Sequence, residues 1–350
     1  MITQYASTNF CLHLVLMLAL VCGSLAAQNA TAAPPLAAAG NVTSSPTVFE
    51  DWTTPSLDTS HLKMAEPLVG EVDDVDGVYT AELTRVIWRP GDPIDLYIMK
   101  PDGVKNPPVI LYLYSYPFET DKFLNHAFCK FLVKNGYAAV GFASALTGQR
   151  YHDRPMKEWF VSEMPEALAD SAHDVQMILN YLAQRGDFDM NRVGMFGDGS
   201  GATIAILAAV ADPRIKTLDL LNPWGDWTDW VPRSTRIPED ERPNYLKPEW
   251  LAKVAPLDPV KWLPQLTTQK IRLQFVKTVP ITPYEAQQKM EAAAPKNVQI
   301  VRYDNLTAFR NSVADGSGFD WIKQQVGGGA PIQNAAVKPQ SNGSSTSAQK

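Results

Sequence analysis

A glycine-rich turn in the middle of the chain has the form of a loop that presents a catalytic nucleophile. Residues 192–196 are a short apolar run, the next five residues read Gly-Asp-Gly-Ser-Gly, and a helix of small residues follows. The strand–turn–helix pattern Gly-x-Ser-x-Gly places a serine at the tip of such a turn. With Gly197 and Gly201 on the glycines of that pattern, Gly199 stands in place of the serine, and Ser200 lies one residue later. The turn therefore has the glycines of a nucleophile loop but no nucleophile at its tip.

The partners of such a nucleophile are also missing from their expected places. A serine attacks a carbonyl carbon with the help of a base and of an acid that orients the base, and the order along the chain in this pattern is serine, acid, histidine. No histidine follows His173, and the acid position after the apolar run 271–276 falls near Pro280. Glycine suits the tip as structure, because it adopts a positive φ at no steric cost. We therefore expect a positive φ at Gly199.

Ser200 is the alternative nucleophile, because it would start the helix, where backbone amides favour an oxyanion. Its base would be His152, His173, Asp198 or a lysine. Each of these residues also has a structural interpretation. The Ser200 hydroxyl or the Asp198 carboxylate would cap the helix start, and His173 would pair with an acid close to its long helix. His152 lies in a loop that could border the site.

The rest of the chain alternates between strand-like and helix-like segments. This order predicts a mainly parallel sheet covered by helices on both faces. Two early strands joined by a Pro-Gly-Asp-Pro turn predict an antiparallel start. The expected strands are 78–88, 94–99, 109–114, 138–142, 192–196, 217–221, 271–276 and 298–303, and the expected helices are 122–134, 163–185, 201–211, 283–293 and 317–325.

One stretch, residues 224–265, lacks a clear period and holds five of the nine tryptophans of the chain. It follows the strand after the glycine-rich turn, where an open parallel sheet accepts a cap beyond its carboxyl edge. The tryptophans either pack this insertion onto the core or form an aromatic wall over a ligand pocket. We expect a concave, largely apolar cavity here, with Trp224 and Trp227 among its lining residues.

Several segments together resemble the α/β-hydrolase superfamily, in the branch of dienelactone hydrolases and secreted peptidase-like esterases. The resemblance covers about residues 75–325 and implies the α/β-hydrolase fold. In this family the turn after the first parallel strand is often His-Gly and forms part of the oxyanion hole, whereas here it reads Tyr-Ser-Tyr-Pro over residues 114–117. The segments that carry the resemblance are 135–141, 187–202, 212–216 and 282–286.

The same resemblance places the catalytic histidine near residues 304–318, a segment that contains none. The sequence therefore predicts a protein that keeps the hydrolase fold, has lost the hydrolytic chemistry and binds a small apolar or ester-like ligand or a partner. The alternative hypothesis is a divergent, esterase-like serine hydrolase that uses Ser200. The residues expected to bind the ligand are Tyr114, Ser115, Tyr116, His152, Asp198, Gly199, Ser200, Trp224 and Trp227.

Other classes of function receive little support from the sequence. The formal net charge is −6, and no run of basic residues is interleaved with aromatic residues, which argues against a nucleic-acid partner. No histidine pair has metal-ligand spacing, and the turn lacks the Gly-x-Gly-x-x-Gly order of a dinucleotide site. We therefore expect no metal and no cofactor, and no motif identifies a protein partner.

The two ends of the chain differ in composition from its middle. Residues 11–22 are almost all apolar, with small residues after them, which predicts a signal peptide over residues 1–27 and export to the periplasm or the medium; an uncleaved membrane anchor is the alternative. Residues 28–50 and 327–350 are rich in small and polar residues, which predicts a flexible linker and a disordered tail. The α/β-hydrolase-like domain is expected over residues 51–326.

Overall fold

The computed structural model describes residues 49–117, 119–146, 163–268, 270–278 and 281–327. The predicted signal peptide, most of the predicted linker and almost all of the predicted tail lie outside these ranges, as do His152 and Pro280. Within the described ranges, no helix is both long enough and apolar enough to cross a membrane.

The described residues form one nine-stranded sheet in the order β1-β2-β3-β5-β4-β6-β7-β8-β9. The first three strands run antiparallel to their neighbours, and the pairs from β5 to β9 are parallel. The predicted fold class, with its antiparallel start, is confirmed. The strands are β1 (Leu68–Val75), β2 (Tyr79–Arg89), β3 (Asp92–Pro101), β4 (Pro108–Leu113), β5 (Ala138–Phe142), β6 (Asp189–Asp198), β7 (Ile215–Leu221), β8 (Lys270–Val276) and β9 (Gln299–Tyr303).

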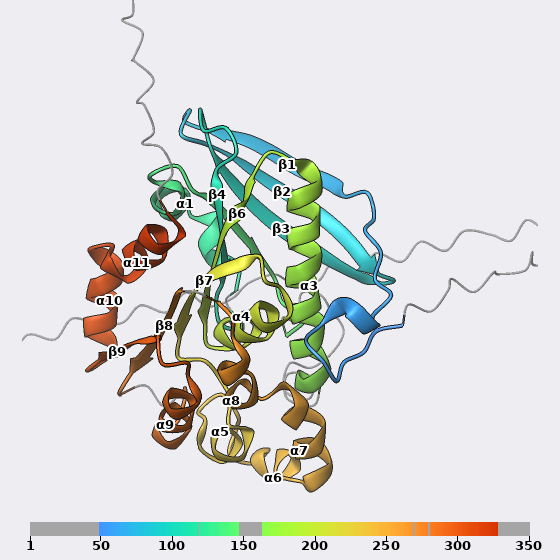
Figure 1. The fold of residues 1–350 in the computed structure, drawn as a ribbon, viewed down its shortest axis with the longest axis vertical. Helices are drawn as coiled ribbons and strands as arrows, with labels where there is room; N and C mark the ends of the chain where they lie inside the picture. Colours follow the sequence, from blue (N-terminus) through green and yellow to red (C-terminus); the bar gives the residue numbers. More distant parts are fainter. Residues whose placement is uncertain (1–48, 118, 147–162, 269, 279–280, 328–350) are drawn as a thin grey trace, which may run out of the picture. The chain divides into compact units, whose positions relative to one another are not determined.

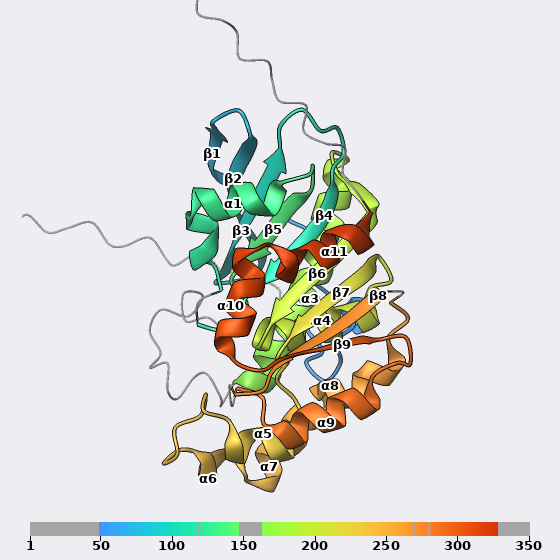
Figure 2. The same ribbon diagram turned by 90° about the vertical axis from the view of Figure 1, so that its left-hand side faces the viewer.

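Helices cover both faces of the sheet and bury two apolar clusters against it (Figure 2). Helices α3 and α4 pack on one face, where the central strands are fully buried because aliphatic side chains meet them from both sides. Helices α1 and α11 lie on the other face with a cluster of aromatic rings. The helices are α1 (His126–Val133), α3 (Met164–Arg185), α4 (Ser200–Ala211), α9 (Tyr284–Ala293), α10 (Leu306–Ala314) and α11 (Ser317–Val326).

The tryptophan-rich stretch is helical, although the sequence shows no clear period there. Its α-helices gather at one end of the sheet, beyond the carboxyl end of β7 (Figure 1). Each of them has at most seven residues, which is too short for an apolar period to repeat. They are α5 (Trp227–Arg233), α6 (Arg242–Tyr245), α7 (Pro248–Val254) and α8 (Pro259–Trp262).

Candidate functional site

The glycine-rich turn joins β6 to α4 with the backbone of a nucleophile loop. Gly199 has φ 57° and ψ −116°, which confirms the predicted positive φ. The flanking glycines allow close packing, because a Cβ at Gly197 would lie 2.5 Å from the Ala202 Cα, and a Cβ at Gly201 would lie 2.3 Å from the Leu113 oxygen. The turn is therefore folded as a strand-to-helix elbow, with a tip that only glycine adopts without strain.

Ser115 fills the place that a side chain at position 199 would take. A Cβ built on Gly199 would lie 2.4 Å from Ser115 Oγ and 3.1 Å from Trp224 Nε1. Ser115 follows β4 and is largely buried. A serine cannot be placed at position 199 unless Ser115 moves, because a hydroxyl from the loop after β4 already occupies the space that its side chain would take.

Ser200 is fully buried, and its Oγ accepts a hydrogen bond of 2.9 Å from the Tyr116 amide. The expected role as a helix cap is wrong, because this amide belongs to the turn after β4 and not to α4. In α/β-hydrolases the oxyanion hole uses an amide from that same turn and the amide of the residue after the nucleophile. The Ser200 hydroxyl therefore occupies a donor that a hydrolase would offer to its substrate.

Asp198 ends β6 and is the ionisable residue of the elbow. Burial raises the pKa of its carboxyl to about 6, although Lys122 and Arg236 oppose that rise. Among the described residues no ion pair joins Asp198 to either cation, and the start of α4 has no side-chain cap, so the expected capping role is also wrong. The Lys122 ammonium instead lies 4.0 Å from the centre of the Tyr114 ring.

The two loops expected to hold the catalytic acid and the catalytic histidine contain residues that make structural hydrogen bonds. After β8, the Thr282 hydroxyl lies 2.9 Å from the backbone oxygens of both Asn222 and Pro223 and ties this loop to the end of β7. After β9, Asn305 caps α10 by accepting a hydrogen bond from the Ala308 amide. Residues 304–318, which contain no histidine, thus include the helix α10, and the sequence did not predict a helix there.

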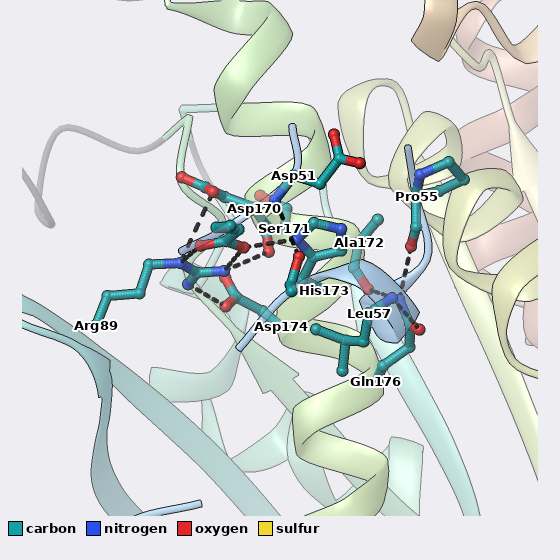
Figure 3. A network of polar contacts seen from close by, with 12 residues as sticks. Asp51, Pro55, Leu57, Arg89, Asp170, Ser171, Ala172, His173, Asp174 and Gln176 are labelled. Atoms are coloured by element: carbon teal, nitrogen blue, oxygen red, sulfur yellow. Dashed lines mark hydrogen bonds and ion pairs between the residues drawn. The ribbon is translucent and has the colours of Figure 1, made fainter. Parts of the chain in front are cut away.

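His173 is held in a buried ionic network and has no free nitrogen (Figure 3). Its Nδ1 lies 2.5 Å from Glu50 Oε1, and its Nε2 lies 3.0 Å from the Thr54 oxygen. A carbonyl and a carboxylate both accept, so both nitrogens donate. The histidine therefore pairs with an acid, as its structural interpretation proposed, and both of its ring nitrogens contact Glu50 and Thr54 rather than a serine.

Arg89 is the centre of that network. Its guanidinium contacts Glu50 and Asp174 at 2.5 Å each and Asp170 at 3.7 Å. Burial alone would raise the pKa of Glu50, but hydrogen bonds from Arg89 and His173 outweigh it and lower the pKa to about 2. Glu50 was expected in the flexible linker, yet it is part of the folded domain.

The cap tryptophans pack with one another and onto the elbow. Trp224, Trp227 and Trp230 are almost fully buried, and the Trp224 and Trp230 rings are 4.9 Å apart. The Trp224 oxygen accepts a 2.6 Å hydrogen bond from Thr203 of α4. This is the packing that the core interpretation predicts, while contact of Trp224 and Trp227 with a ligand stays a prediction.

Two cavities lined by described residues lie away from the elbow. One, of about 370 Å³, lies between residues 64–67 and the end of α3, and the other, of about 160 Å³, lies on the face of β1–β3. No group of three or more histidine, cysteine or acidic side chains with metal-site geometry is found in the described part of the chain. A cavity between the elbow and the cap stays a prediction.

The comparisons with known proteins identify the fold. No protein-family model matches the chain, and no curated protein matches its sequence. An acetyl xylan esterase from Paenibacillus sp. R4 superposes with a TM-score of 0.56 at 15% identity, over 75% of this chain and 89% of the esterase.

Two further structures are similar to this chain, with comparable TM-scores. Acetyl xylan esterase 1 from Thermoanaerobacterium sp. JW/SL YS485 has a TM-score of 0.53 and 12% identity, over 74% and 88% of the two chains. A cold-adapted esterase from an Arctic intertidal metagenomic library has a TM-score of 0.51 and 14% identity, over 76% and 100%. The chain has the α/β-hydrolase fold.

Proposed function

We propose that this protein binds a small carbonyl compound of the acyl-ester class at the elbow and does not hydrolyse it. The observation that carries the proposal is the position of Ser115 Oγ, 2.4 Å from the point where a nucleophile's Cβ would stand. The elbow keeps its backbone geometry, but the space for the reacting side chain is filled by a hydroxyl from the loop after β4. Fold alone does not fix function, so the assignment depends on this site.

The capacity to bind depends on backbone donors at the start of α4. Among the described residues the Ser200 amide has no acceptor, and it lies at the positive end of the α4 dipole. A ligand carbonyl oxygen would accept from this amide and from the Ser115 hydroxyl. The Trp224 indole near Gly199 would contact the apolar part of the ligand.

The loss of hydrolysis follows from the missing base. Ser115 and Ser200 are weak nucleophiles unless a neighbouring group takes the hydroxyl proton. The His173 nitrogens both donate elsewhere, and the loops that would hold the acid and the histidine carry Thr282 and Asn305 in structural roles.

The second candidate is an esterase-like hydrolase that uses Ser200. The comparisons favour this candidate more than the first, since the similar structures named above are all esterases. Asp198, with its pKa raised by burial to about 6, would be its base at neutral pH. Ser200 would first have to leave the Tyr116 amide, which it now accepts from.

Hydrolysis of 4-nitrophenyl butyrate and labelling by a fluorophosphonate probe distinguish the two candidates. We expect no turnover above a heat-denatured control and no labelling. We also expect ethyl butyrate to raise the unfolding temperature of the wild type and of Ser312→Val, a control in α10, but not that of Ser115→Val. Turnover that Ser200→Ala abolishes would establish the second candidate, and no response to the ester would rule out the first.

We also propose that the protein is exported by a cleaved signal within residues 1–27, with a membrane anchor as the alternative. The support is the apolar run 11–22 and the small residues that follow it. Sequencing the amino terminus of the protein recovered from its native host tests this. A start near residue 28 is expected, and an intact Met1 in a membrane fraction would favour the anchor.

A further inference from the structure

The antiparallel part of the sheet has a groove on the face that carries α1. A cavity of about 160 Å³ lies there, over β1, β2 and β3 and beside the residues that lead into α1. The residues of its floor form two rows that cross the strands. Each row starts with an acidic residue on β1 and continues with one less polar residue on β2 and one on β3. The rows are Glu71–Leu83–Tyr97 and Asp73–Ala81–Met99. These six residues are called the acidic groove below.

The inner end of the acidic groove is apolar. The Phe123 ring stacks on Tyr97 with a centroid distance of 5.5 Å and an interplanar angle of 21°. Next to it, the Leu124 side chain is 71% exposed. The floor of the acidic groove is therefore apolar at the end away from β1.

The outer end of the acidic groove carries unbalanced negative charge. Glu71 and Asp73 are exposed, and no described cation forms an ion pair with either. The neighbouring charges are already paired: Arg85 contacts Asp95 at 2.7 Å, and Glu82 contacts Arg185 at 2.9 Å. A cation that arrives here would thus meet two carboxylates without competition from these neighbours.

The strand that carries these acids is also the edge of the described sheet. β1 pairs with β2 on one side, and its other side has no strand in the order given above. Two copies of β1 would bring acid against acid if they paired with each other, so the charges argue against a second copy. A strand of opposite charge would be accepted instead.

We propose that β1 is the docking edge for an extended basic segment of a partner protein. The segment adds to β1 as a strand, and lysines or arginines at alternate positions place their charges on Glu71 and Asp73. The residue between the two basic residues is apolar and covers Val72, which is 57% exposed on the opposite face.

The test is fluorescence anisotropy with a labelled peptide of sequence Ser-Lys-Val-Lys-Val-Lys-Ser and the full mature protein. We expect saturable binding that weakens at least about tenfold in Glu71→Lys/Asp73→Lys. The control Glu239→Lys/Glu249→Lys makes the same change in net charge at exposed cap residues and is expected to bind like wild type. A peptide with glutamate for lysine should bind the first variant and not the wild type.

Three results would overturn the proposal. Equal weakening in both double variants would mean that net charge alone attracts the peptide. Undiminished binding of a peptide methylated at alternate backbone amides would exclude strand addition. No saturable binding by wild type would exclude the site. If the charge-reversed variant does not fold by circular dichroism, Glu71→Gln/Asp73→Asn replaces it, with a smaller loss expected and unchanged binding counting against the proposal.

Discussion

The polar groups of the elbow and those of the Arg89 network differ in the partners that they contact. In the network, the arginine, His173 and the acids around them are bound to one another in the interior. At the elbow, Asp198 has no ion-pair partner among the described residues, and the serines contact backbone groups. The difference is that the fully buried His173 is held by an acid and a backbone oxygen, while the elbow contains a carboxyl group without an ion-pair partner among the described residues.

The largest loss of stability is expected when Arg89, the centre of the network, is replaced. Arg89→Met would leave Glu50 and Asp174 buried without their cation, and the free energy of unfolding should fall by about 3–5 kcal/mol. Urea unfolding measures this, with Arg233→Met as a control because Arg233 is an exposed partner of Asp229. An equal loss in the two variants would show that the network contributes no more than a surface pair.

A smaller loss is expected at the tip of the elbow. Gly199→Ser places a side chain at positive φ and against Ser115, so it should lower the free energy of unfolding by about 1–3 kcal/mol. It should not produce turnover of 4-nitrophenyl butyrate, because it adds a hydroxyl without a base. Esterase activity in this single variant would reveal a base and contradict the comparison between the two regions.

The two regions should also respond to pH with opposite signs. The pKa of Glu50 is lowered in the folded state, so its contribution to stability is present above its ordinary value of 4.5 and is lost as the pH falls toward 2. The pKa of Asp198 is raised from 3.8, so the folded state is favoured at low pH and loses stability as the pH rises toward 6.

Stability measured from pH 2 to 7 should therefore rise and then fall. Glu50→Gln should remove the rise. Asp198→Asn should remove the fall and make the protein more stable at pH 7, by about 1–2 kcal/mol after allowance for solvent screening. An Asp198→Asn variant that is less stable than wild type at pH 7 would mean that the charged carboxylate has a favourable partner.

The smallest effect is expected at Ser200. Ser200→Ala leaves the Tyr116 amide without its acceptor, which should cost about 1 kcal/mol. Thermal unfolding next to Ser312→Ala, a partly buried serine of α10, provides the comparison. A gain in stability would show that the hydroxyl is not needed to satisfy that amide.

The sequence predicts the sheet well because its parallel strands are continuous apolar runs. It also predicts the positive φ at Gly199, since the spacing of the glycines specifies the turn. β1 was not assigned, because a strand that reads Leu-Val-Gly-Glu-Val-Asp-Asp-Val looks like a charged loop. The short cap helices and α10 were missed for the related reason that few turns give few repeats of the period.

Part of the site could be predicted from the sequence, because Ser115, Tyr116 and Trp224 were expected beside Gly199 and Ser200, and the structure places them there. The absence of a downstream histidine is visible in the sequence, but the contacts that Ser115 and Ser200 make are not. Ser115 and Ser200 are 85 positions apart from each other in the chain, and Tyr116 is 84 positions from Ser200. The spacing of residues along the chain does not reveal that Ser115 lies against Gly199. That contact depends on how closely the ends of β4 and β6 approach each other.

The hydrogen bonds that hold residues 50–57 on α3 can form only after α3 has been synthesised. Glu50 and Thr54 meet His173 across 123 and 119 positions, and the Leu57 amide meets Gln176 across 119. A ribosome adds about 5–20 residues each second, so these first residues of the domain wait several seconds before their partners exist. The contacts of the amino-terminal segment can consequently form only after the chain has been synthesised through residue 176.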